Sequence, residues 1–172
     1  APIVSDGDTL LVTGGAGGIT YEILKQVVAA YRVNLVILDI NDIYATDPAL
    51  LKPTATEADL MAMLRNQMPG EKPVAVKQAL DRLMRVRQSI ANIEYLKSKG
   101  ISVTYHCTDV TDFQAVKKAV DACDRIDGIF HAAGMEMSQF IPKKERKAFE
   151  LVVDVKVKGM RNLLAACKDR DY

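Results

Sequence analysis

Short apolar runs alternate with longer amphipathic segments along this chain. The runs at 9–13 and 34–39 have apolar centres between polar end residues, and such short apolar runs are typical of strands buried on both faces of a parallel sheet. Residues 101–106 and 127–131 predict a third and a fourth strand. Helical periodicity occupies the segments between and after the strands. Strands that alternate with helices predict an α/β fold with a doubly wound parallel sheet, as in the Rossmann fold.

Helices are predicted from apolar spacing and from capping residues. The helix after the first strand has an expected apolar stripe of Ile19, Ile23, Val27 and Ala30. Thr111 is the expected N-cap of a later helix, because Gln114 three positions on would complete a capping box. Pro142 suits the first turn of the last helix. The stripe expected for that helix consists of Phe149, Val152, Val153, Val157, Met160 and Leu164.

The connection between the second and third strands is unusually long. Sixty residues lie between Ile40 and Ile101, whereas a parallel crossover needs about a dozen. A short helix is expected within 57–69 at most, and a long helix rich in Arg and Lys over 74–100, closed by a C′ glycine. We therefore expect a helical insertion at about 43–85, either as a surface hairpin that extends the crossover helix or as a dedicated binding element.

Composition narrows the class of protein. A chain of 172 residues with 49% hydrophobic and 26% charged residues predicts one globular domain with a buried core. A net charge of +1 gives no general electrostatic reason to bind nucleic acid or an anionic membrane, and no run predicts a membrane span. Cys107, Cys123 and Cys167 are few and widely spaced, which fits reduced thiols in a cytoplasmic protein better than a disulfide frame or a metal site.

Four glycines gather between the first strand and the helix that follows it, at 14, 15, 17 and 18. Because glycines have no side chains, the backbone N–H groups at this place can approach a pyrophosphate, whose negative charge is favoured at the amino end of a helix. Gly14 can make the tight turn and Gly18 the close approach. Asp39 ends the second strand 21 positions after Gly18, where an acid would accept hydrogen bonds from the adenosine ribose. The pattern predicts a dinucleotide site; a flexible strand-to-helix turn is the structural alternative.

Motifs at three places resemble those of the short-chain dehydrogenases/reductases. These are "TGGAGGI" at 13–19, "TDV" at 108–110 and "HAAG" at 131–134. The form "HAAG", followed by "KVKG" at 156–159, is similar to the ketoreductase domains of modular polyketide synthases and polyunsaturated fatty-acid synthases. The resemblance extends over nearly the whole chain and brings its own expectations about chemistry.

The resemblance implies hydride transfer from NAD(P)H to the β-keto group of an acyl chain on the phosphopantetheine arm of an acyl carrier protein. It also implies a set of cofactor-binding residues: Thr13, Gly14, Gly15, Gly17, Gly18, Ile19, Asp39, Asp109, Val110, Ala132, Ala133 and Gly134. Lys156 resembles the active-site lysine, which in these domains stands where most reductases keep an Asn. The alternatives are a solvated cation at Lys156 and a turn-capping Asp109. We expect His131 to be a packed end-of-strand residue rather than an acid or a ligand.

Departures from the family pattern affect the cofactor and the product. Thr20 replaces the third glycine, as in the polyunsaturated fatty-acid branch. The family leans to NADPH and often has Gly-Arg after the second strand, but Asp39 and Ile40 stand here. A carboxylate favours the ribose diol of NADH and repels a 2′-phosphate. "GMEMSQ" at 134–139 replaces the Leu-Asp-Asp of one stereochemical class, so the configuration of the product is unassigned.

The resemblance places the catalytic Ser and Tyr on the next strand and helix, beyond "KDRDY" at 168–172. We therefore expect an amino-terminal, cofactor-binding half that is inactive alone and is completed by the rest of the same synthase or by another chain. The expected strand order is 3-2-1-4, with an open apolar edge at the fourth strand. A noncatalytic dinucleotide-binding half-domain and a nucleotide-sugar epimerase or dehydratase are the alternatives.

One basic cluster stands apart from these motifs. It precedes the last helix and comprises Lys143, Lys144, Arg146 and Lys147. Such a run usually forms a solvated face, and contact with the phosphate of a pantetheine arm is the alternative.

Overall fold

Four parallel strands form a single sheet in the part of the chain that the structure describes. The computed structural model describes residues 3–137 and 139–168. The strands are β1 (Thr9–Thr13), β2 (Asn34–Asp39), β3 (Val103–Cys107) and β4 (Gly128–His131), in the order β3-β2-β1-β4. This order confirms the predicted topology. Thr13 pairs with Leu38 of β2 and with His131 of β4, so the loops that follow these strands meet at one edge of the sheet.

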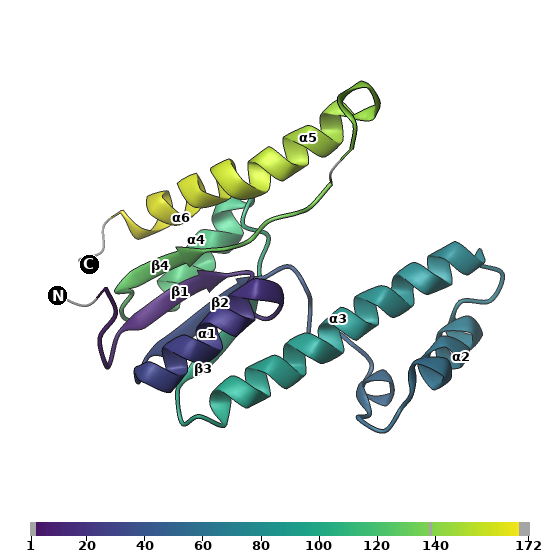
Figure 1. Ribbon diagram of the computed structural model, residues 1–172, viewed down its shortest axis with the longest axis horizontal. Helices are drawn as coiled ribbons and strands as arrows, with labels where there is room; N and C mark the ends of the chain where they lie inside the picture. The colour runs from purple at the N-terminus through teal and green to yellow at the C-terminus, as the bar shows by residue number, and fades with distance from the viewer. Residues whose placement is uncertain (1–2, 138, 169–172) are drawn as a thin grey trace.

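Helices cover both faces of the sheet (Figure 1). One face carries α1 (Gly18–Ala30) and α3 (Pro73–Lys97), and the other carries α4 (Phe113–Asp121) and α6 (Gly159–Cys167). Successive strand residues alternate between the two cores because side chains along a strand point to opposite faces. The core under α1 and α3 includes Val12, Leu35, Ile37, Val103 and Tyr105, and the core under α4 and α6 includes Leu11, Val36 and Leu38. The doubly wound α/β fold is confirmed.

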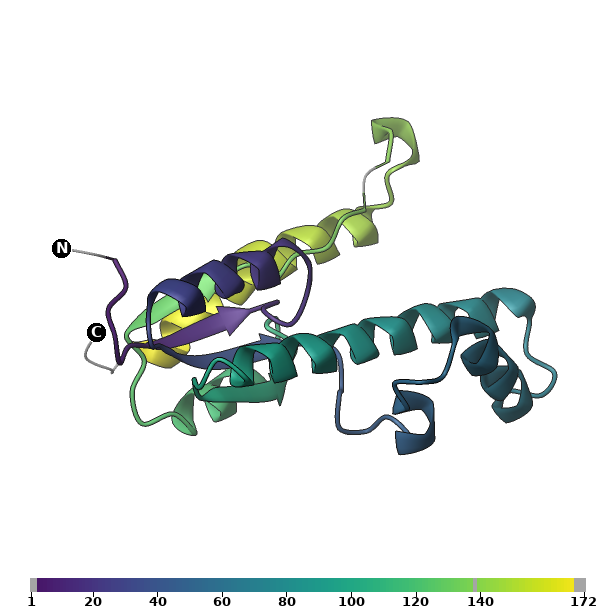
Figure 2. The same ribbon diagram turned by 60° about the horizontal axis from the view of Figure 1, so that its bottom comes forward.

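The long connection between β2 and β3 is helical. It contains the 3-10 helix η1 (Pro48–Leu51), α2 (Glu57–Gln67) and α3. The amino-terminal half of α3 extends beyond the sheet and runs beside α2 (Figures 1 and 2). A separate small core joins these elements and consists of Leu50, Leu60, Leu64, Val76, Leu80 and Leu83. The hairpin thus stabilises itself, while the carboxyl-terminal half of α3 packs on the sheet.

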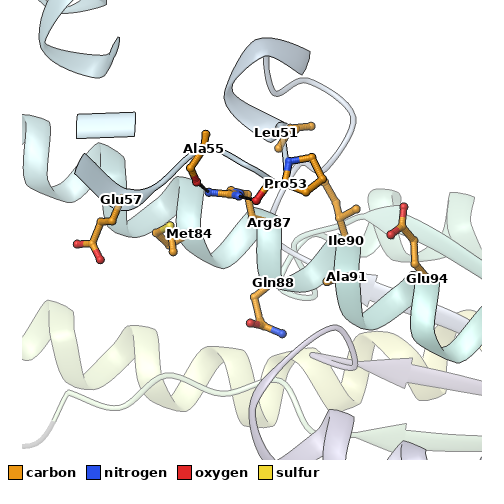
Figure 3. Close-up of a pocket in the computed structure, with 10 residues that line it drawn as sticks. All are labelled: Leu51, Pro53, Ala55, Glu57, Met84, Arg87, Gln88, Ile90, Ala91 and Glu94. Atoms are coloured by element: carbon orange, nitrogen blue, oxygen red, sulfur yellow. Dashed lines mark hydrogen bonds between the residues drawn. The ribbon is translucent and has the colours of Figure 1, made fainter. Parts of the chain in front are cut away.

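A groove of about 660 Å³ lies between α3 and residues 51–57 (Figure 3). Arg87 ties its two walls together, because its guanidinium donates hydrogen bonds to the carbonyls of Lys52, Pro53 and Ala55. Those three bonds are made by Nη1 and Nη2 of the guanidinium, and all three acceptors are backbone carbonyls. The groove is therefore formed where residues 51–57 fold back against α3.

The last helical segment differs from its sequence-based prediction. It begins with the 3-10 helix η2 (Ile141–Lys143) and continues as α5 (Arg146–Val153), a single π-helical turn η3 (Asp154–Lys158) and α6. Phe149, Val157 and Leu164, which were expected in one apolar stripe, are about half exposed. The buried residues of α6 are Gly159, Leu163, Ala166 and Cys167. The π turn interrupts the α-helical repeat, so one stripe cannot run through both halves.

Two further local predictions were wrong. In α1 the buried residues are Thr20, Leu24 and Val28, whereas Ile19 is 82% exposed and Ile23 is partly exposed. The buried positions keep the expected spacing but come one residue later, because the preceding turn sets the rotation of the helix about its axis. In α4 the N-cap is Asp112, whose carboxylate accepts hydrogen bonds from the N–H groups of Gln114 and Ala115. Thr111 is instead bonded to Asp109.

None of the helices in the described ranges combines the length and the apolar character that a membrane crossing requires.

Candidate functional site

The glycine-rich turn joins β1 to α1 at the carboxyl edge of the sheet. Gly14 and Gly18 have φ of +68° and +58°, a region that other residues avoid. A Cβ on Gly14 would approach the Ala133 backbone to 3.2 Å, so this glycine lets the loops after β1 and β4 touch. A Cβ on Gly15 would meet Val12 of the core at 2.9 Å.

The other two glycines of the turn face open space. A Cβ on Gly17 or Gly18 would meet no described atom within 4 Å. Gly17 is the N-cap of α1, and no side chain caps the helix there. The first N–H groups of a helix have no partner within the helix, and they favour an anion. The residues present therefore fit a pyrophosphate: bare backbone, a helix amino end and room in front of it.

Thr13 connects the end of β1 to the loop after β4. Its hydroxyl oxygen accepts hydrogen bonds from the backbone N–H groups of Ala132 and Ala133, at 3.1 and 3.0 Å. The same hydroxyl lies 2.7 Å from Nδ1 of His131. With two donors already on its oxygen, the hydroxyl donates its own hydrogen to Nδ1. Thr13 is fully buried, so these bonds fix the loop that carries Ala132 and Ala133.

His131 in turn connects this loop to the last helical segment. Because Nδ1 accepts from Thr13, Nε2 carries the proton and donates it to the backbone carbonyl of Lys156, at 3.0 Å. Gly159 makes room for the ring, since a Cβ there would lie 3.2 Å from Cε1 of His131 and 2.9 Å from Val110. His131 is therefore a packed end-of-strand residue with both ring nitrogens engaged.

Lys156 lies in the π turn and reaches back over the loop after β4. A Cβ on Gly134 would lie 2.7 Å from Cε and 2.9 Å from Nζ of Lys156. The lysine thus crosses the bare backbone of Gly134, and these two predicted site residues meet although they are 22 positions apart in the sequence. Single π turns are frequent at functional sites.

Asp39 stands at the end of β2, next to the glycine-rich turn. Its Oδ1 accepts hydrogen bonds from the backbone N–H and from Nδ2 of Asn41, at 3.3 and 3.1 Å. Tyr105 of β3 holds Asn41 in place by donating its hydroxyl to the Asn41 carbonyl at 2.5 Å. Burial, followed by the negative charge of Asp39, raises the pKa of Tyr105 far above its ordinary value. The phenol therefore stays protonated and available as a donor.

Asp109 and Val110 follow β3 and have different environments. Asp109 is exposed, and its Oδ1 accepts from the N–H and the hydroxyl of Thr111, both at 2.8 Å. This turn-capping role is the alternative that the sequence left open, and it leaves Oδ2 outside both bonds. Val110 is buried, and its carbonyl accepts from Nδ2 of Asn162 at 2.9 Å. Ile19 lies exposed in the first turn of α1.

The basic cluster lies at the start of the last helical segment and is exposed. Within it, Arg146 pairs with Glu150 at 2.6 Å and Lys144 lies over the Phe149 ring at 5.7 Å. No group of three or more His, Cys, Asp or Glu side chains in the described part of the chain is placed to hold a metal ion.

Sequence reasoning missed several residues that support the site. Asn162 and Tyr105 donate to backbone carbonyls, Asn41 donates to the Asp39 carboxylate, and no motif marks these residues. Asn92 of α3 donates a hydrogen bond from Nδ2 to the Ala16 carbonyl within the glycine-rich turn. Its signal was available: a polar amide stands in a helix stripe whose other members are apolar except for Ser89.

Comparison with known proteins identifies related chains. A family model described as KR domain matches residues 8–172. A polyunsaturated fatty acid synthase component from Thraustochytrium sp. is 31% identical over 179 residues, covering 94% of this chain and 6% of that protein. Polyketide synthase PksM of Bacillus subtilis is 25% identical over 172 residues, covering 98% of this chain and 3% of that protein. The chain thus spans a small part of the length of these relatives.

Solved structures agree on the fold. The N-terminal ketoreductase of the macrolactin assembly line has a TM-score of 0.66 at 19% identity, covering 96% of this chain and 26% of that one. A ketoreductase domain of the bacillaene assembly line has a TM-score of 0.64 at 22% identity, covering 96% and 31%. The NAD⁺-bound xylitol dehydrogenase has a TM-score of 0.62 at 18% identity, covering 94% and 46%.

These comparisons do not favour the epimerase or the noncatalytic alternative. Because the family model covers the chain from Asp8 onward, this protein belongs to the KR, or ketoreductase, domain family.

Proposed function

We propose that this chain is the cofactor-binding part of a β-ketoacyl reductase and binds NAD(P)H at the carboxyl edge of the sheet, between the loops after β1 and β4. The observation that carries the proposal is the open space in front of Gly17 and Gly18 at the amino end of α1. The place is also the switch point of the sheet, where β1 has β2 on one side and β4 on the other, and ligands of doubly wound folds bind at such points.

Each predicted cofactor residue has a role in this proposal. The turn from Gly14 to Gly18 receives the pyrophosphate, with Ile19 above it in the first turn of α1. Asp39 accepts the hydroxyls of the adenosine ribose, and Asp109 and Val110 border the adenine. Ala132, Ala133 and Gly134 present backbone to the nicotinamide ribose, and Thr13 holds that loop in place. When bound, the reduced nicotinamide supplies a hydride.

Lys156 is the catalytic residue that we assign to this chain. Its ammonium lies over Gly134, beside the loop proposed to border the nicotinamide. There a cation would lower the pKa of a proton-donating Tyr supplied from outside residues 1–172. The proposed substrate is a β-ketoacyl chain on the phosphopantetheine arm of an acyl carrier protein, in a cytoplasmic synthase. Lys143 and Lys147, exposed before and within α5, are candidates for contact with the phosphate of that arm.

Asp39 favours NADH over NADPH in this proposal, against the tendency of the family. Its carboxylate is held by Asn41 on one oxygen, which leaves the other to face a ribose diol. A 2′-phosphate at the same place would meet a like charge.

The experiment is calorimetric titration of the chain with NADH and with NADPH. We expect NADH to bind more tightly, and Asp39→Ser to shift the affinity ratio toward NADPH by about tenfold. Asp124→Asn, which removes an exposed carboxylate beyond α4, serves as the matched charge control and should leave the ratio unchanged. If the chain binds neither nucleotide, the glycines serve only the turn and the proposal fails. Reduction of a β-ketoacyl thioester by the complete domain, and its loss on Lys156→Met, then tests the catalytic assignment.

A further inference from the structure

The glycine-rich turn is held from one side by the long helix α3. Ala16, at the centre of the turn and fully buried, accepts a hydrogen bond at its carbonyl from Nδ2 of Asn92, at 2.9 Å. Asn92 is only 4% exposed and comes 76 positions later in the sequence. The bond therefore ties the turn to an element that lies outside every cofactor motif of the chain.

A second hydrogen bond fixes the orientation of the Asn92 amide. Nε2 of Gln88, one helical turn earlier, donates to Oδ1 of Asn92 at 2.8 Å. A flipped amide would set donor against donor at Gln88 and acceptor against acceptor at Ala16. In Figure 3 the Gln88 side chain points away from the segment with Leu51, Pro53 and Ala55. Gln88 is also one of the residues that line the groove of the hairpin, and its hydrogen bond to Asn92 connects it to the glycine-rich turn.

The helix that carries Asn92 is itself firmly placed. Val86, Ile93 and Leu96 of α3 belong to the same buried core as Ala16 and Val12. The donor is therefore presented by a rigid element, while the turn that it holds contains four glycines among its five residues at 14–18. Fixing the backbone of a residue costs conformational entropy, and glycine loses more than any other residue.

A turn that is already ordered loses less entropy when it binds a ligand. The N–H groups near Gly17 and Gly18 follow Ala16 directly, so the orientation of the Ala16 peptide sets where they point. The Asn92 hydrogen bond holds that peptide at its carbonyl, on the buried side, and leaves the opposite side open toward the space in front of Gly17.

We propose that Asn92 is a positioning residue for the dinucleotide: by holding the Ala16 carbonyl, it keeps the turn at Gly14–Gly18 in the shape that receives the pyrophosphate, and Gln88 keeps the Asn92 amide in the required orientation. This inference rests on the proposed function, because it presupposes a dinucleotide at the turn.

The test compares three ligands and four chains by calorimetry. NADH and ADP-ribose contain a pyrophosphate, whereas AMP contains the adenosine and one phosphate. The chains are the wild type, Asn92→Leu, Gln88→Ala and Ser89→Ala. Ser89 is as buried as Asn92 and lies on the same helix, so its variant controls for a polar deletion in α3. Thermal unfolding of each chain reports whether it is folded.

We expect Asn92→Leu to lower the affinity for NADH and ADP-ribose by about five- to tenfold, as the loss of one hydrogen bond would. The affinity for AMP should fall by less than about twofold. Gln88→Ala removes the exposed hydrogen-bond partner of Asn92 and should lower the affinity for the same two ligands by about threefold. Ser89→Ala should bind all three as the wild type does. Amide exchange without ligand should also quicken at Gly14, whose N–H is bonded to Leu38, in Asn92→Leu but not in Ser89→Ala.

Three outcomes would overturn the inference. Equal binding by wild type and both Asn92→Leu and Gln88→Ala shows that the turn does not need the hydrogen bond. Equal weakening of AMP and ADP-ribose shows a general structural role. If Asn92→Leu does not fold, Gln88→Ala becomes the test, and wild-type affinity in that variant overturns the inference. A wild-type chain that binds none of the three ligands rejects the proposed function itself, which distinguishes that failure from the other three.

Discussion

Nε2 of His131 donates a hydrogen bond to the backbone carbonyl of Lys156 at 3.0 Å. This bond joins the end of β4 to the π turn of the last helical segment. Through Nδ1 the same ring is bonded to Thr13 at the end of β1. The lysine backbone is therefore anchored to the edge strand β4 and, through the His131 ring, to its neighbour β1, so its side chain starts from a fixed point.

The first prediction concerns that bridge. His131→Phe keeps a ring but removes both hydrogen bonds, and it leaves the fully buried Thr13 hydroxyl without its acceptor. We expect the free energy of unfolding to fall by about 1–3 kcal/mol, measured by urea denaturation. His106→Phe, at the chain's other histidine, is the matched control, because it leaves the Thr13 bridge intact. An unchanged midpoint for His131→Phe would show that the bridge contributes nothing to stability.

The second prediction separates stability from binding at the N-cap of α1. Gly17 has extended backbone and open space around it, so a side chain fits without strain. Gly17→Ser supplies the missing cap, and we expect stability to rise by roughly 0.3 kcal/mol. The new side chain also enters the space proposed for the pyrophosphate, so NADH affinity should fall at least about tenfold. Denaturation and calorimetry on the same sample measure both. Unaltered affinity for NADH would show that the nucleotide does not bind at this turn.

A third prediction sets helix propensity against packing. Gly159 has ordinary helical φ of −55°, so Ala alone would favour the helix by about 1 kcal/mol. Its Cβ, however, would approach Val110 to 2.9 Å and His131 to 3.2 Å, and overpacking costs about 1–3 kcal/mol. We expect Gly159→Ala to lower the free energy of unfolding by about 1 kcal/mol. A gain in stability would mean that Val110 and His131 can shift to accommodate the Cβ at little energetic cost.

The fourth prediction is a pH dependence from β3. Burial lowers the pKa of His106 below its ordinary value of 6.5. The unfolded chain then binds a proton more readily than the folded one, so stability is complete above pH 6.5 and is lost as pH falls through this value toward the lower folded-state pKa. Urea denaturation at pH 8 and pH 5 should show a smaller loss in His106→Asn than in the wild type. Parallel curves for the two chains would contradict the prediction.

Most of the fold could be predicted from the sequence, because buried parallel strands are nearly continuous apolar runs. The bounds predicted for β1 and β2 agree with the structure, and β3 is displaced by one or two residues. The rotation of α1 about its axis could not be predicted, because Ile19 and Leu24 are equally apolar and only the turn before the helix decides which is buried. The π turn left no pattern in the sequence that periodicity could detect.

The candidate site was predictable where chemistry depends on bare backbone. Glycines mark the turn, and the structure places them between β1 and α1 as expected. Hydrogen bonds to backbone carbonyls carry no such mark, because any polar side chain can make them. Asn92, Asn162 and Tyr105 depend on which segments the fold brings together, and that information lies in the topology and not in a motif.

The single uninterrupted helix α3 has a consequence for how the chain tolerates changes in length. Its first half carries the hairpin core and its second half carries Asn92. A residue inserted near Met84 would rotate one half against the other by about 100°, which would turn the hairpin out of its present direction or pull Asn92 away from Ala16. A residue inserted in the loop at 68–72 would disturb neither. We therefore expect the insertion to tolerate changes of length in its loops and not within α3, whose two halves must keep their relative rotation.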